Sequence, residues 1–113
     1  EFFNNDWNLV LSAMKGRPFH IQGDLDLTFK KIESLGGLES VGGDLSLVAS
    51  GIKSLGNLKS VGGNLNISLS QIRSLGDLQS VGGDLSLIST FIALKYSKTQ
   101  ISQMVDVKGT IFI

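Results

Sequence analysis

The sequence predicts a repeat solenoid with a short parallel β-sheet, little helix within the repeats and a helical cap at each end. The first observation is a phrase that recurs every 20 residues, starting at Val41, Val61 and Val81, with a fainter copy from Ile21. The second is that 11 of 20 positions are identical between residues 41–60 and 61–80. A fixed period of 20–50 residues is typical of solenoids, in which each unit buries its apolar face against the next.

Six positions of the repeat stay aliphatic in three successive copies, which predicts a continuous apolar core. The six columns are Leu25/Leu45/Leu65, Leu27/Leu47/Ile67, Ile32/Ile52/Ile72, Leu35/Leu55/Leu75, Leu38/Leu58/Leu78 and Val41/Val61/Val81.

The alternation Leu45-Ser46-Leu47 predicts a short strand whose leucines point inward and whose serine points outward. Stacked coils would pair these strands into a parallel sheet with a spacing of about 4.8 Å. The remaining aliphatic positions are three residues apart. This spacing favours a looped or 3₁₀-like return path over a second long strand.

Small and charged residues also recur in register, and they predict corners and contacts between coils. We expect Gly43, Gly63 and Gly83 to supply positive φ angles at the strand entrance. The hydroxyls of Ser34 and its equivalents Ser54 and Ser74 are expected to bind local backbone. Ion pairs between neighbouring coils are expected in two columns of the return path. These columns are Glu33/Lys53/Arg73 and Glu39/Lys59/Gln79.

The N-terminal cap is predicted to be a helix over residues 5–15, with Asn4 or Asn5 as its N-cap and Gly16 and Pro18 ending it. Its apolar stripe is expected to cover the open end of the core. The stripe consists of Trp7, Val10, Leu11 and Met14.

The C-terminal end departs from the repeat after Ile92. Residues 97–100 read as a capping box that starts a second helix. The segment 108–113 then repeats the strand phrase and predicts a fifth strand. Such an open apolar edge favours pairing with another chain, so a homodimer through Ile111, Phe112 and Ile113 is one expectation.

The core phrase Leu45-x-Leu47-x-x-Ser50-x-Ile52 resembles the L-x-L-x-x-N-x-L core of leucine-rich repeats. With Gly-Gly before the strand, the unit is similar to receptor L domains and to short bacterial or phage repeats. The resemblance covers residues 23–94 and implies a right-handed superhelix. The family's Asn position is occupied here by Lys30, Ser50, Ser70 and Thr90, so hydroxyls are expected to bridge coils more weakly.

The composition narrows the possible function. The 113 residues predict one domain, with a cap over 1–22, repeats over 23–94 and a helix plus strand over 95–113. Ten basic and ten acidic residues argue against nucleic acid or an anionic membrane as the main partner. The absence of cysteine removes disulfides and thiolate chemistry. No apolar run approaches the ~18 residues of a membrane span. The sequence leaves the cellular location open.

The outward positions of the strands form the candidate binding face. We expect this face to bind a protein or a glycan without catalysis, cofactor or metal. Two alternatives stay open: a spacer or self-assembly element that uses the 111–113 edge, and a glycan hydrolase or lyase that would depend on His20 or Asp44. The face comprises Asp24, Asp26, Asp44, Ser46, Val48, Asn64, Asn66, Ser68, Asp84, Ser86 and Ile88.

Overall fold

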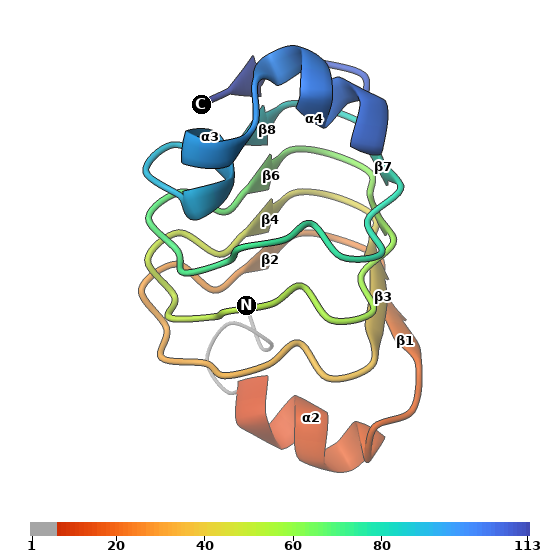
Figure 1. Ribbon diagram of the computed structural model, residues 1–113. Coiled ribbons are helices and arrows are strands. Elements are labelled where there is room, and N and C mark those ends of the chain that lie inside the picture. Colours follow the sequence, from red (N-terminus) through yellow and green to blue (C-terminus); the bar gives the residue numbers. More distant parts are fainter. Residues whose placement is uncertain (1–6) are drawn as a thin grey trace.

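The chain winds into a stack of similar coils with helices at both ends (Figure 1). The structure is a computed structural model that describes residues 7–113. The stack is 39 Å long and 22 Å across in each of the other two directions. The predicted repeat solenoid of parallel strands is therefore confirmed.

Two parallel sheets of five strands each run along the stack. Sheet A consists of β1 (Phe19–Ile21), β3 (Leu38–Val41), β5 (Ser60–Val61), β7 (Ser80–Val81) and β9 (Asp106–Val107). Sheet B consists of β2 (Leu25–Asp26), β4 (Leu45–Ser46), β6 (Leu65–Asn66), β8 (Leu85–Ser86) and β10 (Ile111–Phe112).

Equivalent residues of successive coils are direct partners in both sheets. In sheet B, Leu25 pairs with Leu45, Leu45 with Leu65, and Leu65 with Leu85. The last pairing, Leu85 with Ile111, spans a longer connection because the C-terminal helices intervene. The constant 20-residue period thus fixes the register of the sheet.

Sheet A was not expected from the sequence. Its repeated strands, such as Ser60–Val61, have no apolar–polar alternation, because the nearest aliphatic residues, Leu58 and Val61, are three positions apart. The rest of the return path is irregular, as the spacing of its aliphatic residues predicted. A Gly-Gly corner joins β3 to β4, β5 to β6 and β7 to β8, and the end coils have Gln22-Gly23 and Lys108-Gly109 at this place.

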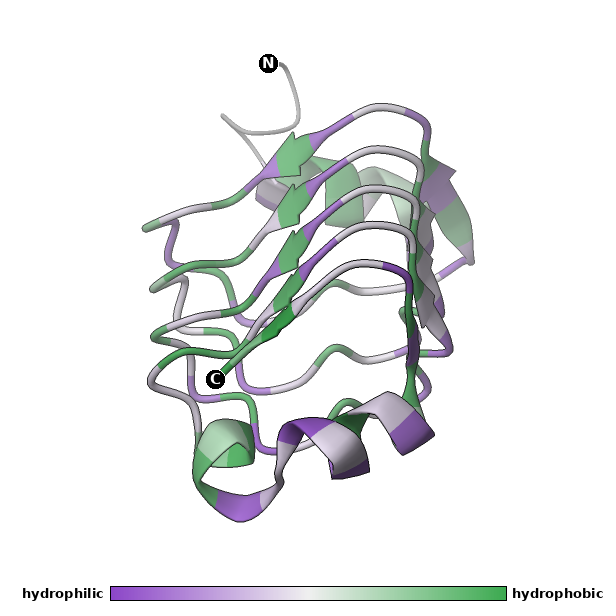
Figure 2. Cartoon of the chain, turned by 90° about the horizontal axis from the view of Figure 1, so that it is seen from above, coloured by the Kyte–Doolittle hydropathy of each residue, from purple (hydrophilic) through white to green (hydrophobic). Residues whose placement is uncertain are grey.

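All six aliphatic columns are buried in one core between the two sheets and the return path. Figure 2 shows hydrophobic residues recurring at the same place in successive coils. Leu25, Leu65 and Leu85 are completely buried. Each coil therefore contributes a layer of aliphatic side chains that covers the layer below.

Helix α2 (Trp7–Met14) closes the N-terminal end of this core. Trp7 and Val10 are buried, and the Trp7 ring lies 5.9 Å from that of Phe19. The Trp7 indole N–H donates to the carbonyl of Ser34 at 2.9 Å. The predicted N-cap at Asn4 or Asn5 lies outside the described residues.

The C-terminal end is closed by α3 (Phe91–Lys95) and α4 (Lys98–Met104). The predicted capping box is confirmed, because Ser97 and Gln100 each bind the other's backbone N–H through their side chains. The fifth strand is confirmed as well, since β10 pairs with β8. The short α3, which Thr90 caps, was not expected. Within residues 7–113, no helix has both the length and the apolar character that crossing a bilayer requires.

Candidate binding surfaces

The eleven candidate face residues lie in three rows on the outside of sheet B. The first row comes just before the strands, the second lies within them, and the third follows them. The rows are Asp24/Asp44/Asn64/Asp84, Asp26/Ser46/Asn66/Ser86 and Val48/Ser68/Ile88.

The first row is a hydrogen-bonded ladder between coils. The side-chain Oδ1 of Asp24 accepts the backbone N–H of Asp44, and that of Asp44 accepts the N–H of Asn64, both at 2.8 Å. Asn64 and Asp84 continue the ladder to Thr110 at the same distance. Because the amide oxygen of Asn64 accepts the same hydrogen bond as the carboxylates do, the ladder needs an acceptor oxygen and no negative charge.

Many hydrogen-bonding groups of the second and third rows also bond to other groups of the protein. The Asp26 carboxylate accepts the hydroxyl of Thr28 at 2.6 Å and its backbone N–H at 3.0 Å. These two bonds, with the nearby charge of Lys30, hold the pKa of Asp26 below its ordinary value. Ser68 is buried, and its hydroxyl lies 2.8 Å from that of Ser86.

Towards the C-terminal end the face becomes apolar. Ile88 in the third row is 48% exposed, and Phe112, which continues the second row in β10, is 43% exposed. Ile113 beside them is also exposed. The face therefore combines a polar area with an apolar cluster at one end.

The Gly-Gly corner between the sheets is tightly stacked, and we call it the tight corner (residues 42–43, 62–63 and 82–83). A Cβ on Gly62 would overlap the backbone carbonyl of Gly42 in the coil below. A Cβ on Gly63 would overlap the Asp44 side chain that forms the ladder. The prediction of positive φ at Gly43, Gly63 and Gly83 was wrong, because close approach between coils requires these glycines instead.

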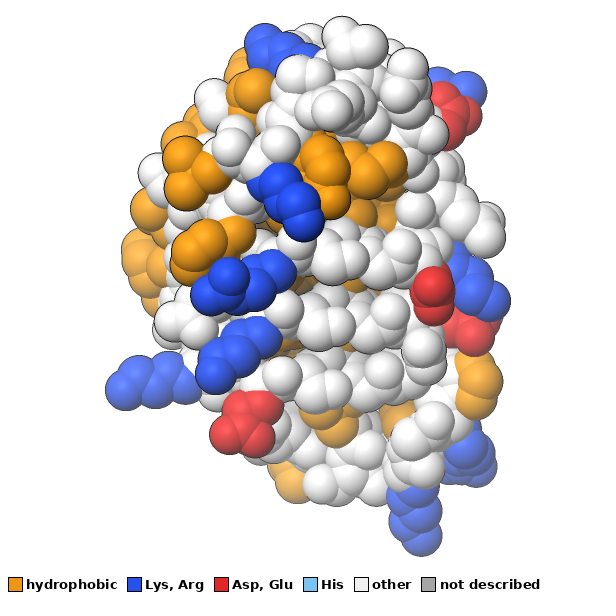
Figure 3. Space-filling view, viewed as in Figure 1, with side chains coloured by type: hydrophobic (Ala, Val, Ile, Leu, Met, Phe, Trp, Pro, Cys, Tyr) orange, Lys and Arg blue, Asp and Glu red, His pale blue; other side chains and the backbone are white. Residues whose placement is uncertain are grey.

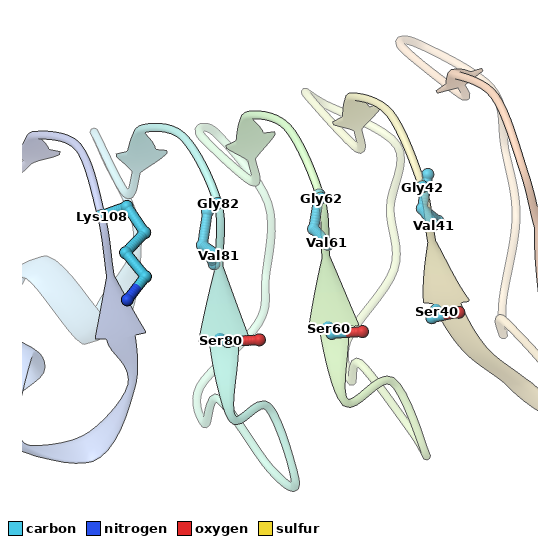
Figure 4. Close-up of a pocket in the computed structure, with 10 residues that line it drawn as sticks. All are labelled: Ser40, Val41, Gly42, Ser60, Val61, Gly62, Ser80, Val81, Gly82 and Lys108. Atoms are coloured by element: carbon cyan, nitrogen blue, oxygen red, sulfur yellow. The ribbon is translucent and has the colours of Figure 1, made fainter.

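A shallow groove of about 340 Å³ runs along the tight corner and the end of sheet A (Figure 4). It is lined by a row of serine hydroxyls, by the glycines and by the backbone of the valines between them. Lys108 lies at one end of this row (Figure 4). The lining serines are Ser40, Ser60 and Ser80.

His20 lies beside this row, close to a hydroxyl and a carboxylate, the two kinds of group that surround the histidine of a catalytic triad. Its Nδ1 is 2.6 Å from the hydroxyl of Ser40, and its Nε2 is 4.0 Å from a carboxylate oxygen of Glu39. The second distance is too long for the hydrogen bond that fixes the imidazole in a triad. His20 is also exposed. The arrangement is a surface hydrogen bond with a carboxylate nearby.

One predicted ion-pair column is present and the other is absent. Lys59 lies 3.9 Å from Glu39, as expected. Within residues 7–113, neither Lys53 nor Arg73 comes within 4.0 Å of a carboxylate, so the predicted pairing with Glu33 was wrong. The Arg73 guanidinium instead stacks on the ring of Phe91, 4.0 Å from its centroid.

The hydroxyls at the Asn position of the resembled family do not bridge coils. Ser70 accepts the N–H of Ile72, and Thr90 donates to the carbonyl of Leu87, both within the same coil. The Ser54 hydroxyl accepts the N–H of Gly56 as predicted. Ser50 is buried, and its hydroxyl has no hydrogen-bond partner among the residues described. The expectation of weak bridging between coils was therefore wrong.

The turn that follows each sheet B strand places a non-glycine residue at positive φ, and sequence reasoning missed it. We call this turn the loose corner, defined by its four left-handed residues. Phe29 is 75% exposed there and Leu69 is 59% exposed. The four residues are Phe29 (φ 61°), Ala49 (53°), Leu69 (61°) and Ser89 (60°). The only signal in the sequence is that this column changes side chain in every coil.

No group of three or more potential metal ligands among His, Cys, Asp and Glu occurs in the described part of the chain. Comparison with protein-family models finds no match for this sequence, and comparisons with curated proteins and with solved structures find none either.

Proposed function

We propose that this chain is a non-enzymatic binding module of the short bacterial or phage leucine-rich-repeat type. It recognises a protein partner through the outer face of sheet B. The leucine-rich-repeat assignment is supported by the 20-residue register and by the L-x-L core phrase on β4, β6 and β8. The hydroxyls at the family's Asn position distinguish this chain within that type.

The exposed cluster of Ile88 and Phe112 is the observation that supports a protein partner. Protein interfaces commonly combine a central aromatic or aliphatic anchor with a polar rim. Here the rim is supplied by Ser46, Asn66 and Ser86, which are half-buried in the second row. Because the ladder and the short hydrogen bonds hold these rows in place, binding would require little ordering of the face.

Capture of a partner from a cell extract, followed by titration of the purified partner, tests this proposal. We expect Ile88→Ser/Phe112→Ser to weaken binding by more than tenfold, since truncation of interface anchors costs about 2 kcal/mol or more. Phe29→Ser/Leu69→Ser removes similar exposed area at the loose corner and serves as the matched control. Equal weakening by both pairs, or binding to a glycan alone, would contradict the proposal.

Self-assembly is a second candidate, and one observation favours it. Strand β10 is the last strand of sheet B, and Ile113 beside it is exposed. A second copy could therefore extend the sheet at this edge. Light scattering over a range of concentrations would reveal a dimer, and Ile113→Lys should abolish it. A monomer at all concentrations would remove this candidate.

The absence of catalysis is part of the proposal and has its own test. Turnover of a panel of glycans and esters is expected to be undetectable for the natural chain. Activity that disappears in His20→Ala and in Ser40→Ala, while both variants keep their melting temperature, would assign a reaction to the His20 pair instead.

A further inference from the structure

We propose that the loose corner, together with the neighbouring α3, docks onto an anionic lipid surface. In this arrangement Phe29, Leu69 and Leu94 enter the interface between headgroups and acyl chains. Lys53 and Arg73 meet the phosphate and carboxylate groups of the lipids. This surface adjoins the sheet B face, because Ile88 lines the same hollow as Leu94. The inference uses different side chains, so it does not depend on the proposed protein partner.

The apolar part of the surface projects outward from the body of the protein. Phe29 and Leu69 occupy the same position two coils apart, about 10 Å along a straight edge. Leu94 on α3 is 87% exposed and lines a hollow of about 500 Å³ with Ser89, the last residue of the loose corner. Figure 3 shows hydrophobic side chains gathered along this edge of the molecule, at the left of the view.

The left-handed backbone at Phe29 and Leu69 makes a large side chain energetically costly, so folding by itself does not account for these residues. A left-handed conformation costs an L-residue about 1–2 kcal/mol, and glycine adopts it without that cost. The chain does place glycine at positive φ elsewhere, for example at Gly51 and Gly56. Phe29 and Leu69 therefore combine a strained backbone with exposed apolar area, and neither feature contributes to the core.

Cations flank this apolar edge, and two of them form no ion pair with a described carboxylate. Lys53, Gln71 and Arg73 line a polar hollow of about 450 Å³ with Phe91. Phe91 also lines the apolar hollow next to Leu94, so the two hollows adjoin. Among residues 7–113, Lys53 and Arg73 have no carboxylate within 4.0 Å. Figure 3 shows Lys and Arg side chains beside the hydrophobic ones.

This combination favours a lipid surface over a folded protein. The apolar side chains stand on a projecting edge, where a soft interface can surround them on all sides. Each cation near an anionic bilayer contributes roughly 1 kcal/mol to binding. The balanced net charge argued against an anionic membrane, but it averages over the whole surface. Near the loose corner the basic residues Lys30, Lys53 and Arg73 outnumber the acidic residues Asp26 and Glu33. The carboxylates of Asp24, Asp44 and Asp84 are held in the sheet B ladder.

Co-sedimentation with vesicles tests the inference directly. We expect the protein to sediment with phosphatidylcholine vesicles that contain phosphatidylserine and to remain free with phosphatidylcholine alone. High salt should weaken binding by screening the charges. Lys53→Gln/Arg73→Gln should weaken binding about 30-fold, since two contributions of about 1 kcal/mol are lost. Lys98→Gln/Lys108→Gln changes the net charge equally on α4 and next to β9, and it should bind as the natural chain does.

Fluorescence provides a second readout that does not depend on charge. The indole introduced by Leu94→Trp should shift its emission to the blue when anionic vesicles are added. The buried Trp7 provides a constant background. Because Leu94 makes little contact with the core, neither this change nor Leu94→Ser should alter the melting temperature, and Leu94→Ser should bind the vesicles more weakly.

Three outcomes would overturn the inference. The first is no sedimentation of the natural chain with anionic vesicles at low salt. The second is equal loss of binding in both charge variants, which would show that net charge acts without this corner. The third is binding of an acidic, phenylalanine-containing peptide at Lys53 and Arg73 with no binding to vesicles, which would assign the corner to a protein partner.

Discussion

The tight and loose corners of each coil solve the same problem, a sharp change of chain direction, in opposite ways. At the tight corner Gly42, Gly62 and Gly82 lack side chains because the coil below occupies that space. At the loose corner Phe29 and Leu69 carry large side chains although their backbone conformation favours glycine. Packing between coils decides the residues of the first corner and leaves those of the second free.

This difference separates positions that maintain the fold from positions available for binding. The tight corner and the ladder at Asp44 repeat with little change because each coil rests on the one before. The loose corner changes from Phe29 to Ala49 to Leu69 to Ser89. A variable residue on a repeated frame is how a solenoid acquires a specific surface.

The largest expected loss of stability comes from a substitution in the core between the two corners. Leu65→Asp should unfold the domain, because it buries an unpaired charge where the natural side chain is completely covered. The total stability of a domain this size is about 5–15 kcal/mol. Circular dichroism should show loss of the cooperative melting transition. Leu69→Asp, an equal chemical change at the loose corner, should melt near the natural temperature.

A pair of substitutions compares the two corners directly. Gly62→Ala should lower the free energy of unfolding by about 3 kcal/mol, since the added methyl group meets backbone that cannot move aside. Leu69→Gly should change it by less than about 1 kcal/mol, because relief of the left-handed strain offsets the added freedom of the unfolded chain. Urea denaturation measures both. Similar losses at the two corners would invalidate the distinction between them.

The stability provided by the ladder next to the tight corner should depend on the position of the acceptor oxygen and not on its negative charge. Asp44→Ala removes the acceptor for the N–H of Asn64 and should cost about 1 kcal/mol. Asp44→Asn keeps an acceptor in the same place, as Asn64 already does, and should leave the melting temperature nearly unchanged. A large loss in Asp44→Asn would mean that the carboxylate charge has a role of its own.

The smallest expected effect is a pH dependence of stability, which arises from Asp26 near the start of the loose corner. The pKa of Asp26 is lowered in the folded state by the Thr28 hydroxyl and backbone N–H. Its ionised form therefore stabilises the fold above its ordinary pKa near 3.8, and this contribution disappears as the pH falls through the lower folded value. The difference in melting temperature between the natural chain and Asp26→Asn should shrink below about pH 4. A difference that grows in acid would contradict this account.

The core of the fold was predictable because it depends on short-range patterns. All six aliphatic columns, the Ser97–Gln100 capping box and the returning strand at Ile111 occur where the sequence indicated. Most of the candidate face also lies on the outer side of sheet B, since alternation in Leu45-Ser46-Leu47 fixes which side chains point inward, but Ser68 in the third row is buried. Sheet A was missed because a strand such as Ser60–Val61 leaves no periodic signal.

The remaining features depended on contacts that no local pattern specifies. Arg73 was predicted to pair along the column from Glu33, but the turn of α3 brings Phe91 over its guanidinium. The role of Asp44 in the ladder requires knowing that the backbone of the next coil lies 2.8 Å away. The left-handed positions of the loose corner are not occupied by glycine, the residue that would have indicated a positive φ in the sequence.

The period, the buried columns and the parallel pairing of equivalent positions follow from the sequence, because a repeat that buries the same positions in every copy stacks them in register. How closely the coils approach, which carbonyls exclude a side chain at Gly62, and which apolar and basic residues share the loose corner depend on tertiary contacts. These features arise from distances between coils, and such distances exist only once the chain has stacked.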